Sequence, residues 1–226
     1  NSLAVVETRV ENTQSVIYRN GAADFEMTEE DVCALPYSAF QAMVTTGTVL
    51  AAEPSRSAAL KAFALAKAAG VPIVFDIDYR PYTWTSADEA EQVLSHAATF
   101  CDVIIGNDEE FGFMAGGYDR GLSKARALAA DTAKIVVYKM GEKGAVTFAG
   151  GKEIHTGIYP VNAVKPNGAG DSFMAGLLSG IAEDLPLRDA VLRGSACASI
   201  VVSKPGCAPA MPDHAQLAAF LADHPG

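Results

Sequence analysis

The stretch Lys165–Gly176, "KPNGAGDSFMAG", places two glycines and an alanine directly before an aspartate, and small and apolar residues follow it. This composition is typical of a glycine-rich turn that leads into a helix. Gly168 and Gly170 let backbone N–H groups converge, because no Cβ atom stands in the way, and the helix adds its positive N-terminal end. The stretch therefore predicts either an ordinary helix start or a cradle for a phosphoryl group, with Asp171 placed to accept a proton.

The segments around this stretch alternate between helical and strand patterns. Residues 54–70 predict a helix with proline at its start and glycine at its end, and residues 72–78, "PIVFDID", predict a buried strand that ends in acidic residues. Further predicted helices begin at 28 and 107, cover 86–98, 123–130, 187–203 and 213–222, and follow Gly168; further strands lie in 39–47, 102–106, 134–141 and the β-rich patch 145–161. Such alternation with short connections favours an α/β fold with a doubly wound, mostly parallel sheet flanked by helices.

The N-terminal residues follow a different pattern. Two apolar, β-branched runs are broken at Glu11–Thr13, which indicates a small β hairpin ahead of the α/β domain.

Composition and charge exclude several classes of protein. The chain has 226 residues, half of them hydrophobic, which favours one domain or one domain with a small appendage. Its net charge of -10 argues against nucleic acid or an anionic membrane as a partner. No apolar run is as long as a membrane span and no signal-peptide pattern opens the chain, so we expect a soluble, cytoplasmic protein. The four scattered cysteines indicate small buried residues in a reducing compartment, and the four histidines form no metal-ligand pattern.

A first polar pattern stands where the strand in 72–78 ends, and ligands bind at that edge of such sheets. Asp76-x-Asp78-x-Arg80 has the period-two spacing that puts three side chains on one face of a strand. An arginine among acids can grip a phosphate or a carboxylate, and a surface salt-bridge ladder explains the pattern equally well.

Two more patterns follow the next strands. Asn107-x-x-Glu110 offers hard oxygen atoms that could hold water around Mg²⁺, and the same spacing is that of a helix capping box. Lys139-x-Gly141-x-x-Gly144 permits close approach of a ligand to the backbone, with Lys139 within reach of a phosphate, and is also what a plain β-turn requires.

Each pattern is common alone, but their order along the chain resembles that of the PfkB, or ribokinase-like, family of carbohydrate kinases. The closing stretch Ser195–Pro212, "SACASIVVSKPGCAPAMP", is similar to the helix and loop on the adenine side of that family's site. The resemblance covers essentially the whole chain. Its most specific part is Gly-Ala-Gly-Asp followed by a helix of small residues.

The resemblance implies ATP-dependent phosphorylation of a sugar hydroxyl, with ATP and a small sugar acid as partners. It makes Asp171 the catalytic base and gives the anion hole to the amides of Gly168, Ala169, Gly170 and Asp171. By the same resemblance, Asn107 and Glu110 organise Mg²⁺ through water, and the nucleotide lies along Lys139, Gly141 and Gly144, with Ser195 and Ala198 beside the adenine. We expect Asp76, Asp78 and Arg80 to bind the substrate or its phosphate.

Two further segments point to one branch of the family. "EPSRSAALKAF" (53–63) and "FDIDYRPYTW" (75–84), together with Lys165-Pro166, resemble the kinases that act on 5-dehydro-2-deoxygluconate, a six-carbon sugar acid of inositol catabolism, and make its 6-phosphate. Arg80 then suits a carboxylate or phosphate. A kinase for 2-keto-3-deoxygluconate or another sugar, and a nucleotide-binding fragment without turnover, remain alternatives.

The chain also departs from the family pattern. Most members have Asp-Thr where this chain has Lys165-Pro166, and that pair helps form a monovalent-cation site, so the departure weakens the expectation of potassium activation. Members also carry first strands and a glycine-rich sugar-binding segment ahead of the lid hairpin, whereas this chain opens at the hairpin. The resemblance therefore implies a lid-like hairpin segment over 1–27, a nucleotide- and sugar-binding domain over 28–226, and a homodimer through the hairpin.

Overall fold

The computed structural model describes residues 3–6, 15–18, 21–165 and 167–224. The described chain falls into two compact units. The first runs from Gly21 to Gly141 and continues from Ala145 to Ile154, and the second contains the N-terminal strands, residues 142–144 and the chain from His155 onward. Each unit is described by itself below, and the expected division at residues 27 and 28 stays a prediction.

The N-terminal strands of the second unit form an antiparallel ribbon. Strand β1 (Leu3–Val6) pairs with β2 (Ser15–Tyr18), and the register places Leu3 opposite Tyr18 and Val5 opposite Val16. The two predicted strands are thus present, and the predicted break at Glu11–Thr13 lies outside the described residues.

A six-stranded sheet follows the order of the chain, β3 to β8. Its strands are β3 (Met43–Thr46), β4 (Ile73–Asp76), β5 (Val103–Asn107), β6 (Ile135–Lys139), β7 (Ala145–Ala149) and β8 (Lys152–Thr156). Strands β3 to β6 are parallel to one another and β7 runs antiparallel to β6. The predicted α/β fold with a mostly parallel sheet flanked by helices is confirmed.

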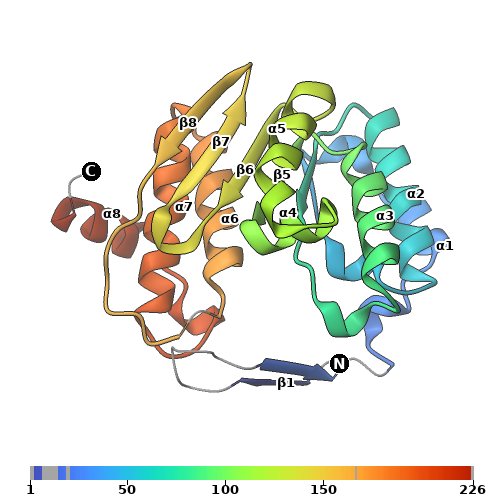
Figure 1. Cartoon of the computed structure of the whole chain (residues 1–226), viewed down its shortest axis with the longest axis horizontal. Helices are drawn as coiled ribbons and strands as arrows, with labels where there is room; N and C mark the ends of the chain where they lie inside the picture. Colours follow the sequence, from blue (N-terminus) through green and yellow to red (C-terminus); the bar gives the residue numbers. More distant parts are fainter. Residues whose placement is uncertain (1–2, 7–14, 19–20, 166, 225–226) are drawn as a thin grey trace. The chain divides into compact units, whose positions relative to one another are not determined.

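The first unit supplies five of the helices. They are α1 (Glu29–Cys33), α2 (Ser55–Ala68), α3 (Ala87–Ala98), α4 (Asp108–Met114) and α5 (Gly121–Asp131). Side chains of Thr28, Ser86 and Asn107 accept hydrogen bonds from backbone amides in the first turns of α1, α3 and α4, as their sequence patterns predict. Figure 1 shows α4 and α5 together beside β5 and β6.

Short 3-10 turns connect these elements. They cover Ala23–Phe25, Tyr37–Ala39, Gly47–Leu50, Pro81–Thr83, Tyr118–Arg120, Gly141–Lys143 and Ala208–Ala210. The sequence predicts a strand over 39–47, but β3 is shorter and begins only at Met43. The 3-10 turn at Tyr37–Ala39 occupies the start of the predicted range.

The core of the first unit lies between the sheet and its helices. Phe75 and Ile104 from neighbouring strands are fully buried together with Phe63 of α2, Leu94 of α3 and Phe111 of α4. Strand β4 is buried along its whole length, which explains why its sequence is a continuous apolar run rather than an alternation.

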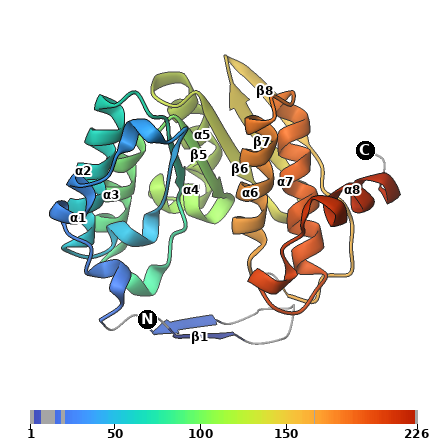
Figure 2. The same cartoon turned by 180° about the vertical axis from the view of Figure 1, so that it is seen from behind.

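The second unit is built on three helices, α6 (Ala169–Ala182), α7 (Leu187–Val202) and α8 (His214–Asp223). Helices α6 and α7 lie side by side, as Figures 1 and 2 both show. Small residues at their contact, such as Gly180 and Ala190, let the two backbones approach closely. The core of this unit includes Tyr159, Ile200 and Leu217.

Two expectations from composition can be compared with the fold. All four cysteines are free, but only Cys101 and Cys197 are buried. The prediction of buried cysteines is therefore wrong for Cys33, the exposed last residue of α1, and for Cys207, which is exposed directly before the 3-10 turn Ala208–Ala210. No helix in the described part of the chain is long and apolar enough to cross a membrane.

Candidate active site

In the first unit, the ends of the central strands bring the predicted polar residues to one edge of the sheet. Asp76 ends β4, Asn107 ends β5 and Lys139 ends β6. The register sets Asn107 beside Lys139 and Thr46 beside Asp76. Because these strands are parallel, the carboxyl ends meet at the same edge, where ligands bind in sheets of this kind.

The backbone after β4 does not follow the predicted ladder. The strand ends at Asp76, and Asp78 has a φ of 35°, in the left-handed region that an aspartate tolerates better than most residues. Asp76, Asp78 and Arg80 therefore do not share one face of a strand, and that prediction is wrong. The turn instead brings Asp78 Oδ1 within 2.5 Å of Arg80 Nη2, and the Arg80 side chain stays 41% exposed.

Asn107 and Glu110 form a reciprocal cap at the start of α4. The Glu110 amide donates to Asn107 Oδ1 at 2.8 Å, and the Asn107 amide donates to Glu110 Oε2 at 2.7 Å. The capping explanation of this spacing is thus confirmed. The cap uses one oxygen of each side chain and holds both at the end of β5, so it does not compete with a role in binding.

The pKa of the Glu110 carboxyl is shifted by its surroundings. Its side chain is buried, and burial raises the pKa of the carboxyl to about 7, with further raising by Asp76 and Asp78. Lys139 and the Asn107 amide act in the opposite direction. These mutual effects show that the acids and Lys139 form one electrostatic cluster. Near neutral pH the Glu110 carboxyl is thus present in both its protonated and its ionised form.

A small cavity of about 80 Å³ adjoins this cluster. Its lining combines the predicted residues Arg80, Asn107 and Glu110 with four that the sequence patterns missed, namely Tyr79, Pro81, Glu109 and Phe113. The rings of Tyr79 and Phe113 lie 4.2 Å apart. The sequence signal for Tyr79 and Pro81 is the aromatic, proline-containing run 79–84 that follows β4, but nothing in the sequence pairs that run with Phe113.

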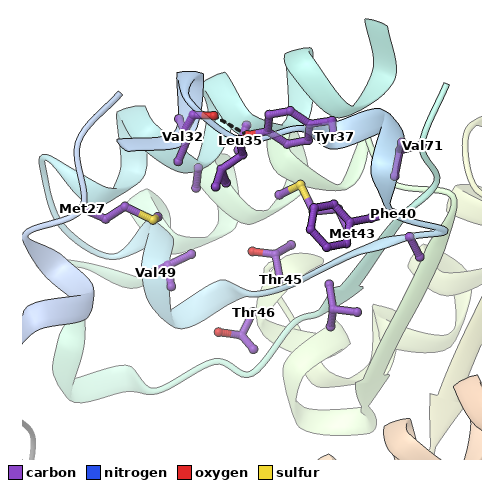
Figure 3. A pocket seen from close by; sticks show the side chains of 14 residues that line it. Met27, Val32, Leu35, Tyr37, Phe40, Met43, Thr45, Thr46, Val49 and Val71 are labelled. Carbon is purple, nitrogen blue, oxygen red and sulfur yellow. Dashed lines mark hydrogen bonds between the residues drawn. The ribbon is translucent and has the colours of Figure 1, made fainter. Parts of the chain in front are cut away.

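A larger groove of about 420 Å³ lies elsewhere in the first unit and contains none of the predicted site residues (Figure 3). Its lining from α1, α2 and β3 is almost wholly apolar and includes Met27, Val32 and Met43. Tyr37 also lines this groove, and its hydroxyl group donates a hydrogen bond to the Val32 carbonyl at 3.0 Å (Figure 3). Such a lining offers a phosphate or a sugar few partners, so we place no chemistry there.

The turn after β6 gives its two glycines separate explanations. Gly141 and Gly144 have φ values of 56° and 83°, as the plain-turn explanation predicts. A Cβ atom at Gly144 would lie 2.0 Å from the carbonyl oxygen of Thr156, whereas one at Gly141 would meet nothing within 4 Å. Gly144 is therefore required by packing, and the expected contact of both glycines with a nucleotide stays a prediction.

The second unit contains the glycine-rich turn. Helix α6 begins at Ala169, and its N-cap Gly168 has a left-handed φ of 83° and no side chain to accept from the first amides. The first intrahelical bond runs from the Ser172 amide to the Gly168 carbonyl at 3.0 Å, so the amides of Ala169, Gly170 and Asp171 have no acceptor within the helix. Helices α2, α5 and α7 also start without a side-chain cap, but α6 alone among the described helices starts at a left-handed glycine.

The acid in this turn is accessible. Asp171 lies in the first turn of α6 and its side chain is exposed. Helix α6 therefore presents N–H donors that have no acceptor within the helix, the positive end of its dipole and a carboxylate within one turn. A group of this kind can stabilise negative charge and accept a proton.

Ser195 and Ala198 lie on α7 in the same unit. Ser195 is buried, and its hydroxyl donates to the Gly157 carbonyl at a long 3.5 Å, whereas Ala198 is half-buried. The structure thus gives Ser195 a partner of its own, and a contact of either residue with adenine stays a prediction.

The residues present fit a divalent cation held largely through water. No cluster of three or more His, Cys, Asp or Glu side chains that could hold a metal ion occurs among the described residues. In the first unit, Asp76 and Asp78 nevertheless lie close enough to Glu110 to raise its pKa, and carboxylates are hard oxygen ligands that would suit Mg²⁺ if phosphates and waters completed its coordination.

Comparison with known proteins gives a consistent family. A model of the "pfkB family carbohydrate kinase" matches residues 1–214. The chain is 39% identical to 5-dehydro-2-deoxygluconokinase of Geobacillus kaustophilus (strain HTA426), over 98% of this chain and 68% of that protein. The chain spans about two thirds of the length of the curated relatives it matches.

Solved structures agree on the fold. Fructokinase from Vibrio cholerae O395, solved with fructose, ADP and calcium ion bound, is 26% identical to this chain and superposes with a TM-score of 0.81. The match covers 97% of this chain and 73% of the fructokinase chain. A double mutant of that enzyme, solved with fructose, ADP and potassium ion bound, is 25% identical with a TM-score of 0.81. That match covers 97% of this chain and 72% of the mutant's chain. Fructokinase from Xylella fastidiosa, solved with bound ATP, shares the fold at a TM-score of 0.87 and 17% identity, and the match covers 100% of this chain and 74% of the fructokinase chain. The chain belongs to the PfkB family of carbohydrate kinases.

Proposed function

We propose that the full-length protein containing this chain transfers the γ-phosphoryl group of ATP to a hydroxyl of a sugar acid. The first candidate substrate is 5-dehydro-2-deoxygluconate, with its 6-phosphate as product, because curated relatives with about 38% identity carry that activity in their names. The observation that carries the proposal is the start of α6, where Gly168 provides no side-chain cap for the first backbone donors and Asp171 is exposed in the same turn.

The chemistry follows from that turn. Asp171 accepts the proton of the substrate hydroxyl as its oxygen forms a bond to the γ-phosphorus, and the bond to the β-phosphate oxygen breaks. The amides of α6 donate to the oxygens on which negative charge develops, and the helix dipole adds to this stabilisation. Little covalent chemistry is asked of the protein, so placement of hydroxyl and phosphate decides the rate.

The strand-end cluster of the first unit supports the nucleotide and substrate roles. Asn107, Glu110 and Lys139 are assigned to the phosphates of ATP and to water around Mg²⁺, which neutralises charge on those phosphates when bound. Arg80 is assigned to the carboxylate of the sugar acid: it already pairs with the carboxylate of Asp78 in this structure and remains accessible. We do not assign to this chain the potassium ion that one solved relative holds.

The experiment that tests the proposal is a screen of coupled ADP release. Full-length protein with Mg²⁺ and ATP is offered aldonic, keto-deoxy and inositol-derived acids, and neutral sugars as controls. We expect turnover with a sugar acid, highest with 5-dehydro-2-deoxygluconate. Highest turnover with 2-keto-3-deoxygluconate would select the alternative kinase, and ATP binding without turnover on any acid would select a nucleotide-binding fragment.

A homodimer through the β1–β2 ribbon is a further proposal. Leu3 with Tyr18, and Val5 with Val16, are cross-strand pairs on one face of the ribbon, and all four side chains are about half exposed or more. An apolar face of this kind is costly to leave in water, and a second copy offers the same surface, as a two-fold interface requires.

A further inference from the structure

Lys165 is the one basic side chain that is buried among the described residues, with 8% of its surface exposed. A buried ammonium is costly unless its protons are bonded. Lys165 Nζ donates to the backbone carbonyl of Asn167, two residues along the chain. The loop that leads into the Gly168 cap of α6 therefore carries a fixed positive charge.

The backbone of this loop is bonded to the end of α7. The amides of Val164 and Lys165 both donate to the carbonyl oxygen of Val202, the last residue of α7, at 2.7 and 3.2 Å. The C-terminal end of a helix carries partial negative charge, and the last turn of α7 contains no basic residue of its own. This end of the helix favours a positive charge, and Lys165 is a basic residue whose backbone amide is bonded to it.

The described atoms around the Lys165 side chain do not fit a potassium ion. A hard cation needs several oxygen lone pairs turned toward it, but the carbonyls of Asn167 and Val202 already accept from N–H groups. A second positive charge beside the Lys165 ammonium would also be repelled. Asn167 Oδ1 is buried with no hydrogen-bond partner among the described residues. The Lys165 ammonium has two further N–H groups, and a small rotation of the side chain would let one of them donate to this oxygen.

We propose that the Lys165 ammonium is a built-in monovalent cation, so that phosphoryl transfer by this protein needs no potassium ion. The proposal rests on the kinase function proposed above. Lys165 is a positioning residue: through the Asn167 carbonyl it holds the residue that precedes the Gly168 cap, and so orients the amides at the start of α6.

A first test measures potassium binding without turnover. Thermal unfolding of full-length protein is compared in potassium chloride and choline chloride at a fixed ionic strength of about 0.1 M, so that general screening is equal. Wild-type protein is expected to unfold at the same temperature in both salts, because an ion that binds only the folded state raises that temperature. Specific stabilisation of the wild type by potassium would overturn the proposal.

A second test measures the role of the charge in catalysis. Lys165→Met keeps the length of the side chain without its charge and is expected to lower kcat/KM by about 10-fold to 100-fold, as loss of groups that orient a charged site does. Lys165→Arg is expected to retain most of the activity in choline, and Lys204→Met, at the same end of α7, serves as a control for bulk charge. Equal activity of Lys165→Met and wild type in choline would contradict the role.

The two proposals fail in different ways. If full-length protein turns over no sugar acid in either salt, the proposed function fails, while the unfolding temperatures still decide whether potassium binds. If it turns over a sugar acid but kcat rises about 10-fold or more with potassium over choline, the function stands and the assignment of Lys165 is wrong.

Discussion

Replacement of Glu110 by glutamine tests the burial of the acid cluster at the strand ends. Glu110→Gln keeps an oxygen that accepts from the Asn107 amide, so the cap of α4 survives, but it removes the ionisable group. Folding raises the pKa of this carboxyl from 4.5 to about 7. The folded state therefore binds the proton more tightly than the unfolded state does.

The sign of the effect on stability follows directly. Between pH 4.5 and 7 the folded state holds more protons, so the free energy of unfolding falls as pH rises through this window. The shift of about 2.5 pKa units corresponds to about 3 kcal/mol at 1.36 kcal/mol per unit. Compared with a neutral side chain, ionised Glu110 thus costs the folded protein up to about 3 kcal/mol above pH 7 and close to nothing below pH 4.5.

The assay is thermal unfolding of wild type and variant at pH 5 and pH 8. At about 2–4 °C per kcal/mol for a chain of this size, Glu110→Gln should unfold about 6–12 °C higher than wild type at pH 8, with a much smaller difference at pH 5. Glu109→Gln, one residue away and exposed, is the matched control, and it should change the unfolding temperature by the same amount at pH 5 and at pH 8. A Glu110→Gln gain of equal size at both pH values, or a loss at pH 8, would refute the burial argument.

Three further predictions use other parts of the structure. Gly144→Ala should lower the free energy of unfolding by about 2 kcal/mol or more, measured by denaturant titration, because its Cβ meets the Thr156 carbonyl; an unchanged midpoint would show that the turn adapts. Arg80→Met should raise the KM for the sugar acid by about 10-fold to 100-fold with little change in the KM for ATP, and equal effects on both would count against a carboxylate contact. Val5→Lys with Val16→Lys should convert a dimer to a monomer in light scattering, unless the ribbon is no interface.

Local rules predicted much of this structure because the signals they use are local. The sequence predicts helix starts at Thr28, Ser86 and Asn107, and the side chain of each accepts a hydrogen bond from a backbone amide there. The apolar run that became β4 was equally clear, since a strand buried on both faces needs no alternation. The left-handed φ values of Gly141 and Gly144 also follow from residue type.

The features that sequence reasoning missed depend on tertiary contacts. The ladder from Asp76 to Arg80 failed because the backbone leaves the strand at Asp76 and turns at Asp78, which spacing does not reveal. The pKa of Glu110 depends on burial and on the charges of Asp76, Asp78 and Lys139, which lie about 30 residues away in sequence on either side. The contact of Tyr79 with Phe113 likewise joins two segments that no local pattern connects.

The most direct test of the central claim is single-turnover phosphoryl transfer by full-length Asp171→Asn, with nucleotide affinity measured alongside by calorimetry. The start of α6 is assigned the transfer step, so the variant should bind ATP with unchanged affinity while the rate of transfer to the sugar acid falls by about 10³-fold or more. Transfer at a rate near that of wild type, with the variant folded and ATP bound, would contradict the assignment of Asp171 as the base.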